Sequence, residues 1–253
     1  MSLFNDKLKN IDLKELIFVI IILFLIQFLI NSLNIVDIAP AWVYVFIILY
    51  FICKLRGSFS SFKQDFLDVF SRKMLKSILV VVILNIFLSY GFLYLSNLIL
   101  NAFPSIESLI SVHFSLSNSL VVGSFLTTVL ISPISEELIF RGVLLNKLKV
   151  IVPTLFAILI SSLLFASMHT FGSITSAFIF AICMAILYLK TDNILVPIFA
   201  HFLNNLFAES IVIADTAGIL FTNAFVVLIV SILAIISFCI VVYSIVTELN
   251  SFK

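Results

Sequence analysis

The segment Ser132-Pro-Ile-Ser-Glu-Glu-Leu-Ile-Phe-Arg-Gly142 places two adjacent carboxylates and an arginine within a long apolar run. On insertion scales, each charge at the centre of a membrane helix costs about 2.5 to 3.5 kcal/mol, so such charges are paired, hydrated or used in chemistry. In an α-helix, Glu137 and Arg141 lie on one face and can neutralise each other. Glu136 points roughly 100° away from Glu137 and is left to face another partner. A purely structural ion pair therefore leaves Glu136 unexplained.

The composition of the whole chain indicates a membrane protein. Of its 253 residues, 63% are hydrophobic, 11% are charged and 28 are phenylalanine, which lies far outside the range of soluble globular domains. The formal net charge of +1 offers no basic surface, so we expect no nucleic-acid partner. The three cysteines show no paired spacing, which predicts small core residues and neither a disulfide framework nor a zinc knuckle.

Apolar runs of about 17 to 25 residues predict an all-α, polytopic membrane helix bundle. The eight predicted spans are 15–35, 40–54, 77–102, 119–147, 152–169, 173–190, 194–213 and 219–246. The first run lacks a small-residue cleavage site, so it is interpreted as an uncleaved span and not as a signal peptide. No internal repeat or long linker divides the chain, which predicts a single integral membrane domain over residues 1–253.

The distribution of Lys and Arg predicts the orientation in the membrane. With eight spans, every loop that contains Lys or Arg falls on one side, and the opposite loops contain neither. The positive-inside rule makes that side cytoplasmic, so both termini are predicted to be cytoplasmic. The Ile-, Phe-, Lys- and Asn-rich composition suggests a bacterial chain, and we expect a multi-pass protein of the bacterial plasma membrane.

The predicted cytoplasmic loop 54–76 has a helical pattern of its own. Phe59, Phe62, Phe66 and Phe70 recur at helical spacing, with charged residues between them. The pattern predicts an amphipathic helix that lies on the inner leaflet or packs against the bundle.

Polar residues in later spans are candidates for partners of Glu136. His169 and His201 fall in predicted spans, where imidazole is unusual and usually partnered. Asn205 shares a helix face with His201. Pro133 removes a backbone hydrogen bond and predicts a kink or break just before Glu136, where water can enter. An interhelical hydrogen bond worth about 1 kcal/mol would explain either histidine alone.

The depth of these residues along their helices gives a mixed prediction. At 1.5 Å per residue, Glu136 lies roughly 20 Å and His169 roughly 29 Å above the cytoplasmic turn near Lys149. His201 lies only roughly 10 Å above the turn near Asn193. This estimate places His201 too low to join the others unless its helix is tilted.

Two kinds of chemistry fit these side chains if they converge. A carboxylate and a histidine can take a proton from water while two side-chain donors hold an oxyanion, which suits amide hydrolysis. Glu136, His169 and His201 also match a catalytic zinc set that leaves the fourth position for water. The spacing of the residues leaves both alternatives open.

Three motifs, in this order, resemble those of the CAAX-protease and bacteriocin-processing (CPBP, formerly Abi) family of intramembrane proteases. Glu136-Glu137-Leu-Ile-Phe-Arg141 resembles its EExxFR motif. Phe165-Ala-Ser-Met-His169 is similar to its FxxxH motif, and His201-Phe-Leu-Asn-Asn205 to its HxxxN motif. The resemblance covers about residues 119–210, and no motif residue departs from the pattern.

The resemblance implies an eight-helix-type fold with a cavity open to membrane and cytoplasm, and an endopeptidase that cuts a membrane-associated peptide or protein. By this analogy Glu136 and His169 activate water, and His201 and Asn205 bind the oxyanion. The supporting residues are Glu137, Arg141 and Phe165. The resemblance also favours a glutamate mechanism without a cofactor over a zinc-dependent one.

Interpretations of other classes stay open. A non-catalytic membrane regulator or bacteriocin-immunity protein, acting by contact with a sensor kinase or another membrane protein, would carry the same motifs. A small transporter would show a repeat or paired broken helices in two halves, and the sequence shows neither. The sequence also contains no HExxH zinc helix and no GxGD signature of other intramembrane proteases.

For a bacterial protease we expect peptide pheromones, bacteriocin leaders or membrane-protein segments as substrates in preference to prenylated proteins.

Overall fold

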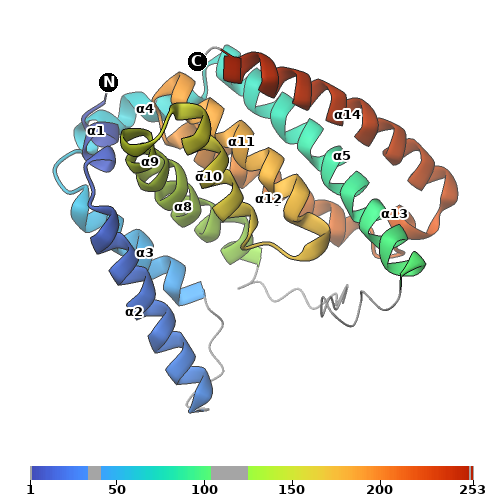
Figure 1. The fold of residues 1–253 in the computed structure, drawn as a ribbon, viewed down its shortest axis with the longest axis horizontal. Helices are drawn as coiled ribbons and strands as arrows, with labels where there is room; N and C mark the ends of the chain where they lie inside the picture. The colour runs from blue at the N-terminus through green and yellow to red at the C-terminus, as the bar shows by residue number, and fades with distance from the viewer. Residues whose placement is uncertain (1, 34–40, 104–124, 251, 253) are drawn as a thin grey trace.

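The computed structural model describes residues 2–33, 41–103, 125–250 and 252, and within these ranges the chain is helical and contains no strand. The helices are α1 (Leu3–Lys9), α2 (Leu13–Ser32), α3 (Ala41–Lys54), η1 (Phe59–Ser61), α4 (Phe62–Val69), α5 (Arg72–Ala102), η2 (Thr127–Ile131), α8 (Ser132–Glu137), η3 (Leu138–Leu145), α9 (Asn146–Ile151), α10 (Thr154–Ala166), η4 (Phe171–Ser173), α11 (Ile174–Thr191), α12 (Leu195–Ala214), α13 (Ile219–Thr222) and α14 (Ala224–Asn250). In Figure 1, α2 and α3 lie at one end of the bundle, α5 and α14 at the other, and α8 to α12 between them.

Several of these helices are long and apolar enough to cross a membrane. Among the described residues there are five, namely α2, α5, α12, α14 and the continuous unit of η4 with α11. A sixth candidate consists of α3 together with η1 and α4, which are bent by 99° relative to it. The predicted all-α membrane bundle is thus confirmed. The count of eight spans stays a prediction, since residues 119–124 of the fourth predicted span lie outside the described residues.

Helix α2 has a capped first turn and an apolar surface. Asp12 caps its first turn, and the backbone N–H groups of Glu15 and Lys14 that bond its carboxylate lower the pKa of Asp12. The helix is apolar on all sides, and Phe18 and Phe28 remain 63% and 67% exposed. A helix of this kind is stable where lipid covers its outer faces.

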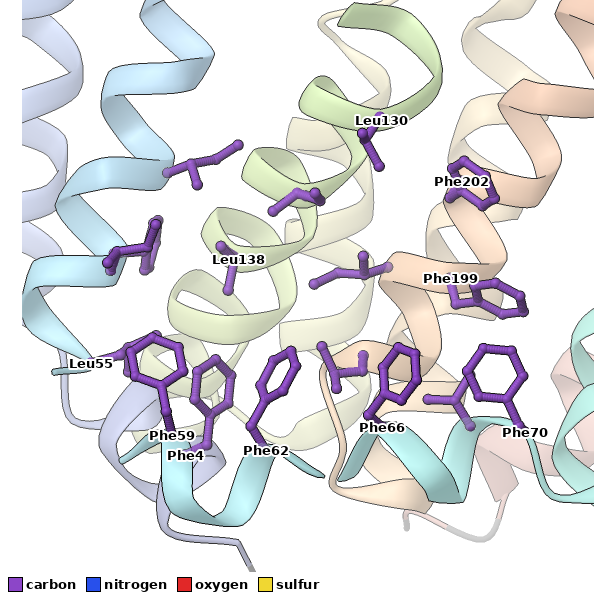
Figure 2. Close-up of a pocket in the computed structure, with 17 residues that line it drawn as sticks. Phe4, Leu55, Phe59, Phe62, Phe66, Phe70, Leu130, Leu138, Phe199 and Phe202 are labelled. Atoms are coloured by element: carbon purple, nitrogen blue, oxygen red, sulfur yellow. The ribbon is translucent and has the colours of Figure 1, made fainter. Parts of the chain in front are cut away.

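The loop between α3 and α5 folds back against the bundle. Its helix α4 contacts α12, and the ring of Phe70 lies 5.2 Å from that of Phe199. Phenylalanines of this loop and of α12 line a cavity of about 390 Å³, which Leu130, Ile134 and Leu138 border from the other side (Figure 2). Every residue around this cavity is apolar.

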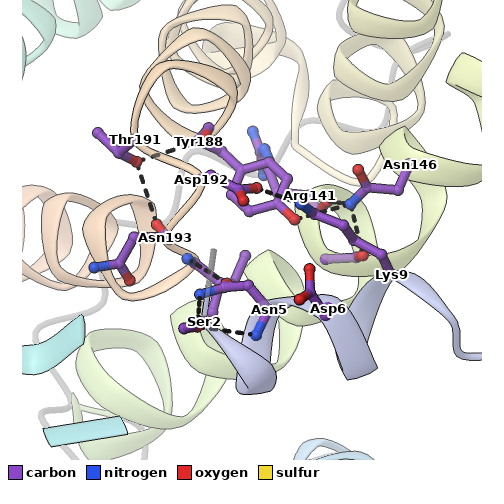
Figure 3. Close-up of polar contacts among 12 residues, drawn as sticks. Ser2, Asn5, Asp6, Lys9, Arg141, Asn146, Tyr188, Thr191, Asp192 and Asn193 are labelled. Atoms are coloured by element: carbon purple, nitrogen blue, oxygen red, sulfur yellow. Dashed lines mark hydrogen bonds and ion pairs between the residues drawn. The ribbon is translucent and has the colours of Figure 1, made fainter. Parts of the chain in front are cut away.

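The short N-terminal helix α1 packs against α4 and the turn between α11 and α12. The side chain of Asn5, which is fully buried, donates to Asp65 and accepts the backbone N–H of Ile194 at 3.0 Å. Lys9 forms an ion pair with Asp192 in the turn between α11 and α12 (Figure 3). Helix α1 therefore ties the start of α12 to the rest of the bundle.

Candidate active site

The EExxFR motif lies on one helical stretch, 127–151, whose hydrogen-bond pattern changes along its length. The α-helical turns of α8, which contain both glutamates, stand between two π-helical segments, η2 and η3. A π-helix places one more residue in each hydrogen-bonded turn than an α-helix does, and such segments are frequent at functional sites. Pro133 stands in the first turn of α8. Where a kink was predicted, the chain thus stays helical, and the helix is wider before and after the two glutamates.

Glu137 and Arg141 form a buried ion pair. Nη1 of Arg141 lies 2.9 Å from Oε1 of Glu137, and the two side chains are 1% and 0% exposed. Nη2 of Arg141 donates to the carbonyl of Ala181 at 3.1 Å. The guanidinium also lies 4.6 Å from the ring centre of Phe165, a favourable cation–π contact. Arg141 thus links the motif helix to α10 and α11.

His201 reaches both glutamates. Its Nδ1 lies 2.8 Å from Oε1 of Glu137, and its Nε2 lies 4.0 Å from Oε2 of Glu136. The depth estimate allowed this contact only if the helix of His201 is tilted. The estimate also assigned an α-helical rise to each residue between Glu136 and Lys149, whereas η3 replaces most of those turns with π turns.

Glu136 has partners that the sequence did not indicate. The hydroxyl of Ser132, one turn before it, donates to its Oε1. Tyr44 of α3 interacts with both Glu136 and Ser132. The side chain of Glu136 is only 11% exposed, and its Oε2 is the oxygen that faces His201. The four-residue spacing of Ser132 and Glu136 could have revealed the first partner, but no local pattern points to Tyr44.

His169 lies beyond the end of its helix. The predicted span 152–169 is too long, because α10 ends at Ala166 and His169 stands in the turn that follows. Its Nδ1 lies 3.2 Å from the carbonyl of Phe165, and the two rings are 4.9 Å apart. His169 interacts electrostatically with Glu136 and His201. The depth estimate of roughly 29 Å treated residues 167–169 as helix, whereas they form a turn.

Phe165 is the apolar centre of the site. Its ring lies 5.3 Å from that of Phe140 and 5.8 Å from that of His201, and it is 1% exposed. The same ring also touches His169 and Arg141. Phe165 thereby holds side chains from all three motifs against one surface.

Asn205, one turn beyond His201, faces the start of the motif stretch. Its Nδ2 donates to the carbonyl of Thr128 at 2.8 Å. Its Oδ1 accepts from Asn204 at 3.3 Å, and Asn204 accepts from Asn85 at 2.9 Å. Sequence reasoning missed both of these asparagines, although a polar residue within the apolar run of α5 was a visible signal.

The residues of the zinc alternative do not form a ligand cluster in this arrangement. Within residues 2–33, 41–103, 125–250 and 252, no three His, Cys, Asp or Glu side chains stand close enough together to hold a metal ion. One nitrogen of His169 is engaged by Phe165 and one of His201 by Glu137. Zinc dependence therefore stays a question for metal analysis of the purified protein.

Comparison with known families agrees with the three motifs. Residues 118–207 match the family model described as type II CAAX prenyl endopeptidase Rce1-like. This segment is similar to the Rce1-like CAAX protease family. It contains every candidate residue predicted from the sequence, from Glu136 to Asn205, and it confirms the resemblance. The comparisons with curated proteins and with solved structures found no match.

Proposed function

We propose that this chain is an intramembrane endopeptidase that hydrolyses a peptide bond of a membrane-associated peptide or protein by means of water activated by Glu136 and His169. The match to an Rce1-like protease family supports peptide hydrolysis. The observation that carries the proposal is the meeting of Glu136, Glu137 and Arg141 with His201, which lies 64 residues from Glu137 in the sequence.

Water activation is assigned to Glu136 and His169. Ser132 engages one oxygen of Glu136, so Oε2 is left to accept a proton. A carbonyl only accepts hydrogen bonds, so Nδ1 of His169 carries the hydrogen in its bond to Phe165. In the neutral ring, Nε2 of His169 is then an acceptor. Both groups can therefore serve as bases toward one water molecule.

Oxyanion binding is assigned to His201 and Asn205. Nδ1–H of His201 donates to Glu137, so His201 becomes a donor toward a substrate when Nε2 is also protonated. The distance of 4.0 Å between Nε2 and Oε2 of Glu136 is too long for a hydrogen bond and leaves both atoms able to contact a reacting group.

The reaction proceeds by addition and elimination at the scissile carbonyl. The water oxygen forms a bond to the carbonyl carbon as its proton passes to the Glu136 and His169 pair. The negative charge that develops on the carbonyl oxygen is held by His201 and Asn205. The carbon–nitrogen bond then breaks, and the same proton is delivered to the leaving amine. The apolar cavity beside Ile134 and Leu138 provides room for an apolar part of the substrate.

Cleavage of defined reporters tests the proposal. The full chain, purified and reconstituted in phosphatidylcholine–phosphatidylglycerol vesicles, is incubated with a farnesylated Cys-aliphatic-aliphatic-X peptide, its unfarnesylated form and a peptide pool of membrane-spanning segments, and fragments are identified by mass spectrometry. We expect cleavage of at least one reporter by the wild type and none by Glu136→Gln, with equal folded yield.

Two results would contradict the proposal. Equal cleavage by wild type and Glu136→Gln would exclude Glu136 as the base. A folded wild-type chain that cleaves no reporter would favour the alternative of a non-catalytic membrane regulator or immunity protein.

A further inference from the structure

Three asparagines from two helices form a chain of hydrogen bonds that ends on the motif stretch. Asn85 of α5 donates to Asn204 at 2.9 Å, Asn204 donates to Asn205 at 3.3 Å, and Asn205 donates to Thr128 at 2.8 Å. Asn85 is 7% exposed, although it lies in the middle of an apolar helix of 31 residues. Polar side chains in such helices are costly and are usually retained for a function.

The carbonyl of Thr128 is available because of Pro133. In η2 the backbone N–H of Ser132 bonds the carbonyl of Thr127, five residues earlier. In this pattern the next donor, for Thr128, would be residue 133, which is proline and has no N–H. A carbonyl left without its helical donor takes another one, and at this exposed position Asn205 supplies it.

This carbonyl fixes the direction of the whole chain. Because a carbonyl only accepts, Asn205 must turn its NH₂ group toward Thr128 and its oxygen toward Asn204. Asn204 must then present its NH₂ group to Asn205, and its oxygen faces Asn85. Asn85 closes the chain as a donor. Each amide is thus held in one of its two orientations.

We propose that Asn85 is a positioning residue that keeps the amide of Asn205 turned with its NH₂ group toward the site. One of the two hydrogens of that group is used by Thr128, and the second remains for a substrate oxyanion. Without Asn85, the oxygen of Asn204 loses its donor, so Asn204 no longer holds its NH₂ group against the oxygen of Asn205. Asn205 is then secured only by Thr128 and can turn its second hydrogen away from the position where the reaction needs a donor. The inference rests on the oxyanion role given to Asn205 in the proposed function, and it lies outside the family match, since Asn85 precedes residue 118.

A double-mutant cycle between Asn85 and Asn205 tests this link in the full chain in vesicles, with the reporter that the wild type cleaves. We expect Asn85→Leu to lower kcat by about tenfold with little change in KM, because it disturbs the orientation of an oxyanion donor and not substrate binding. Asn205→Ala should lower kcat by about a hundredfold. In the Asn205→Ala background, Asn85→Leu should have no further effect, since residues that act through one another are not additive.

Two further variants serve as a second test and as a control. Asn204→Ala breaks the same chain at a half-buried position, so it should reproduce the effect of Asn85→Leu even if the latter folds poorly. Ser96→Ala is the matched control, because Ser96 is equally buried on α5, at 8% exposure, and bonds only to Phe92 of its own helix in the described contacts. We expect Ser96→Ala to cleave at the wild-type rate.

A spectroscopic measurement separates this inference from the proposed function. In protein labelled with ¹⁵N-asparagine, the side-chain resonance of Asn205 is identified by its loss in Asn205→Ala. Asn85→Leu and Asn204→Ala should shift this resonance, and Ser96→Ala should leave it in place, whether or not a reporter is cleaved. An unmoved resonance, or an equal loss of kcat from Asn85→Leu in both backgrounds, would overturn the inference, whereas absent cleavage by the wild type would overturn the proposed function alone.

Discussion

A single carboxylate oxygen connects most of the candidate site at the scale of residues. Oε1 of Glu137 accepts hydrogen bonds from both Arg141 and His201, and all three side chains are at least 95% buried. Glu136, the neighbour of Glu137, is held by Ser132 and faces His201 at a longer distance. We therefore propose different tasks for the two adjacent glutamates, with Glu137 holding the site together and Glu136 taking part in the reaction.

This division predicts different effects of two conservative substitutions. Glu137→Gln leaves Arg141 buried without its countercharge, and breaking a buried pair in this way costs about 3 to 5 kcal/mol. We expect a lower folded yield, a lower melting temperature and lost activity. Glu136→Gln should melt like the wild type and be inactive. Thermal melting and reporter cleavage measured on both variants check this, and equal stability and equal activity in the two variants would refute it.

The local pairings of the site could be predicted from the sequence, but its long-range ones could not. The spacing of Glu137 and Arg141 is enough to predict their ion pair, because a helix brings such residues to one face. The bond between His201 and Glu137 depends on the relative depth of two helices. The depth was estimated for α-helical turns, whereas η3 is a π-helix, and no residue pattern in the sequence predicts a π-helix.

At the scale of elements, the N-terminal helix α1 supports the motif stretch directly. Leu8 of α1 is fully buried and packs against Gly142, the residue after Arg141. A Cβ atom at position 142 would lie 2.8 Å from Cδ2 of Leu8 and 3.0 Å from its Cγ. The glycine is thus required by the close approach of α1. The residues before the first predicted span contributed only charges to the predicted orientation, so this helix was not predicted from the sequence.

This contact predicts a compensating pair of substitutions. Gly142→Ala forces a methyl group against the fully buried side chain of Leu8, and overpacking of this kind costs about 1 to 3 kcal/mol. We expect a lower melting temperature and reduced cleavage. In the Leu8→Ala background the added methyl group has space, so Gly142→Ala should then cost little or nothing. An equal loss in melting temperature with and without Leu8 would show that α1 does not constrain Gly142.

At the scale of the whole molecule, an apolar fraction of 63% was enough to predict a membrane protein, and the length of the apolar runs was enough to predict that it is an all-α bundle. It was not enough to count the spans. α10 has only 13 residues, and the bend of 99° after α3 makes the last part of that unit lie across the bundle. Length and hydropathy do not distinguish such broken or short segments from complete spans.

The orientation predicted from Lys and Arg is tested by reporter fusions. If the eight-span arrangement holds, fusions at residues 65 and 149 should be cytoplasmic, and fusions at 108 and 216 should be on the opposite side, because the loops rich in Lys and Arg stay inside. The ion pair of Lys9 with Asp192 agrees with placing the N-terminus and the turn after α11 on the same side. A fusion at 149 that reports the outer side would contradict the arrangement.

The proposed mechanism is tested most directly by turnover in protein that has been stripped of metal. The purified chain is treated with a strong chelator, its zinc content is determined, and cleavage of the reporter is measured beside Glu136→Gln in the same vesicles. We predict that zinc is not stoichiometric, that wild-type kcat is unchanged by chelation, and that Glu136→Gln is folded and inactive. Loss of turnover on chelation that zinc restores, together with stoichiometric zinc that disappears in His169→Ala and His201→Ala, would show instead that a metal ion activates the water.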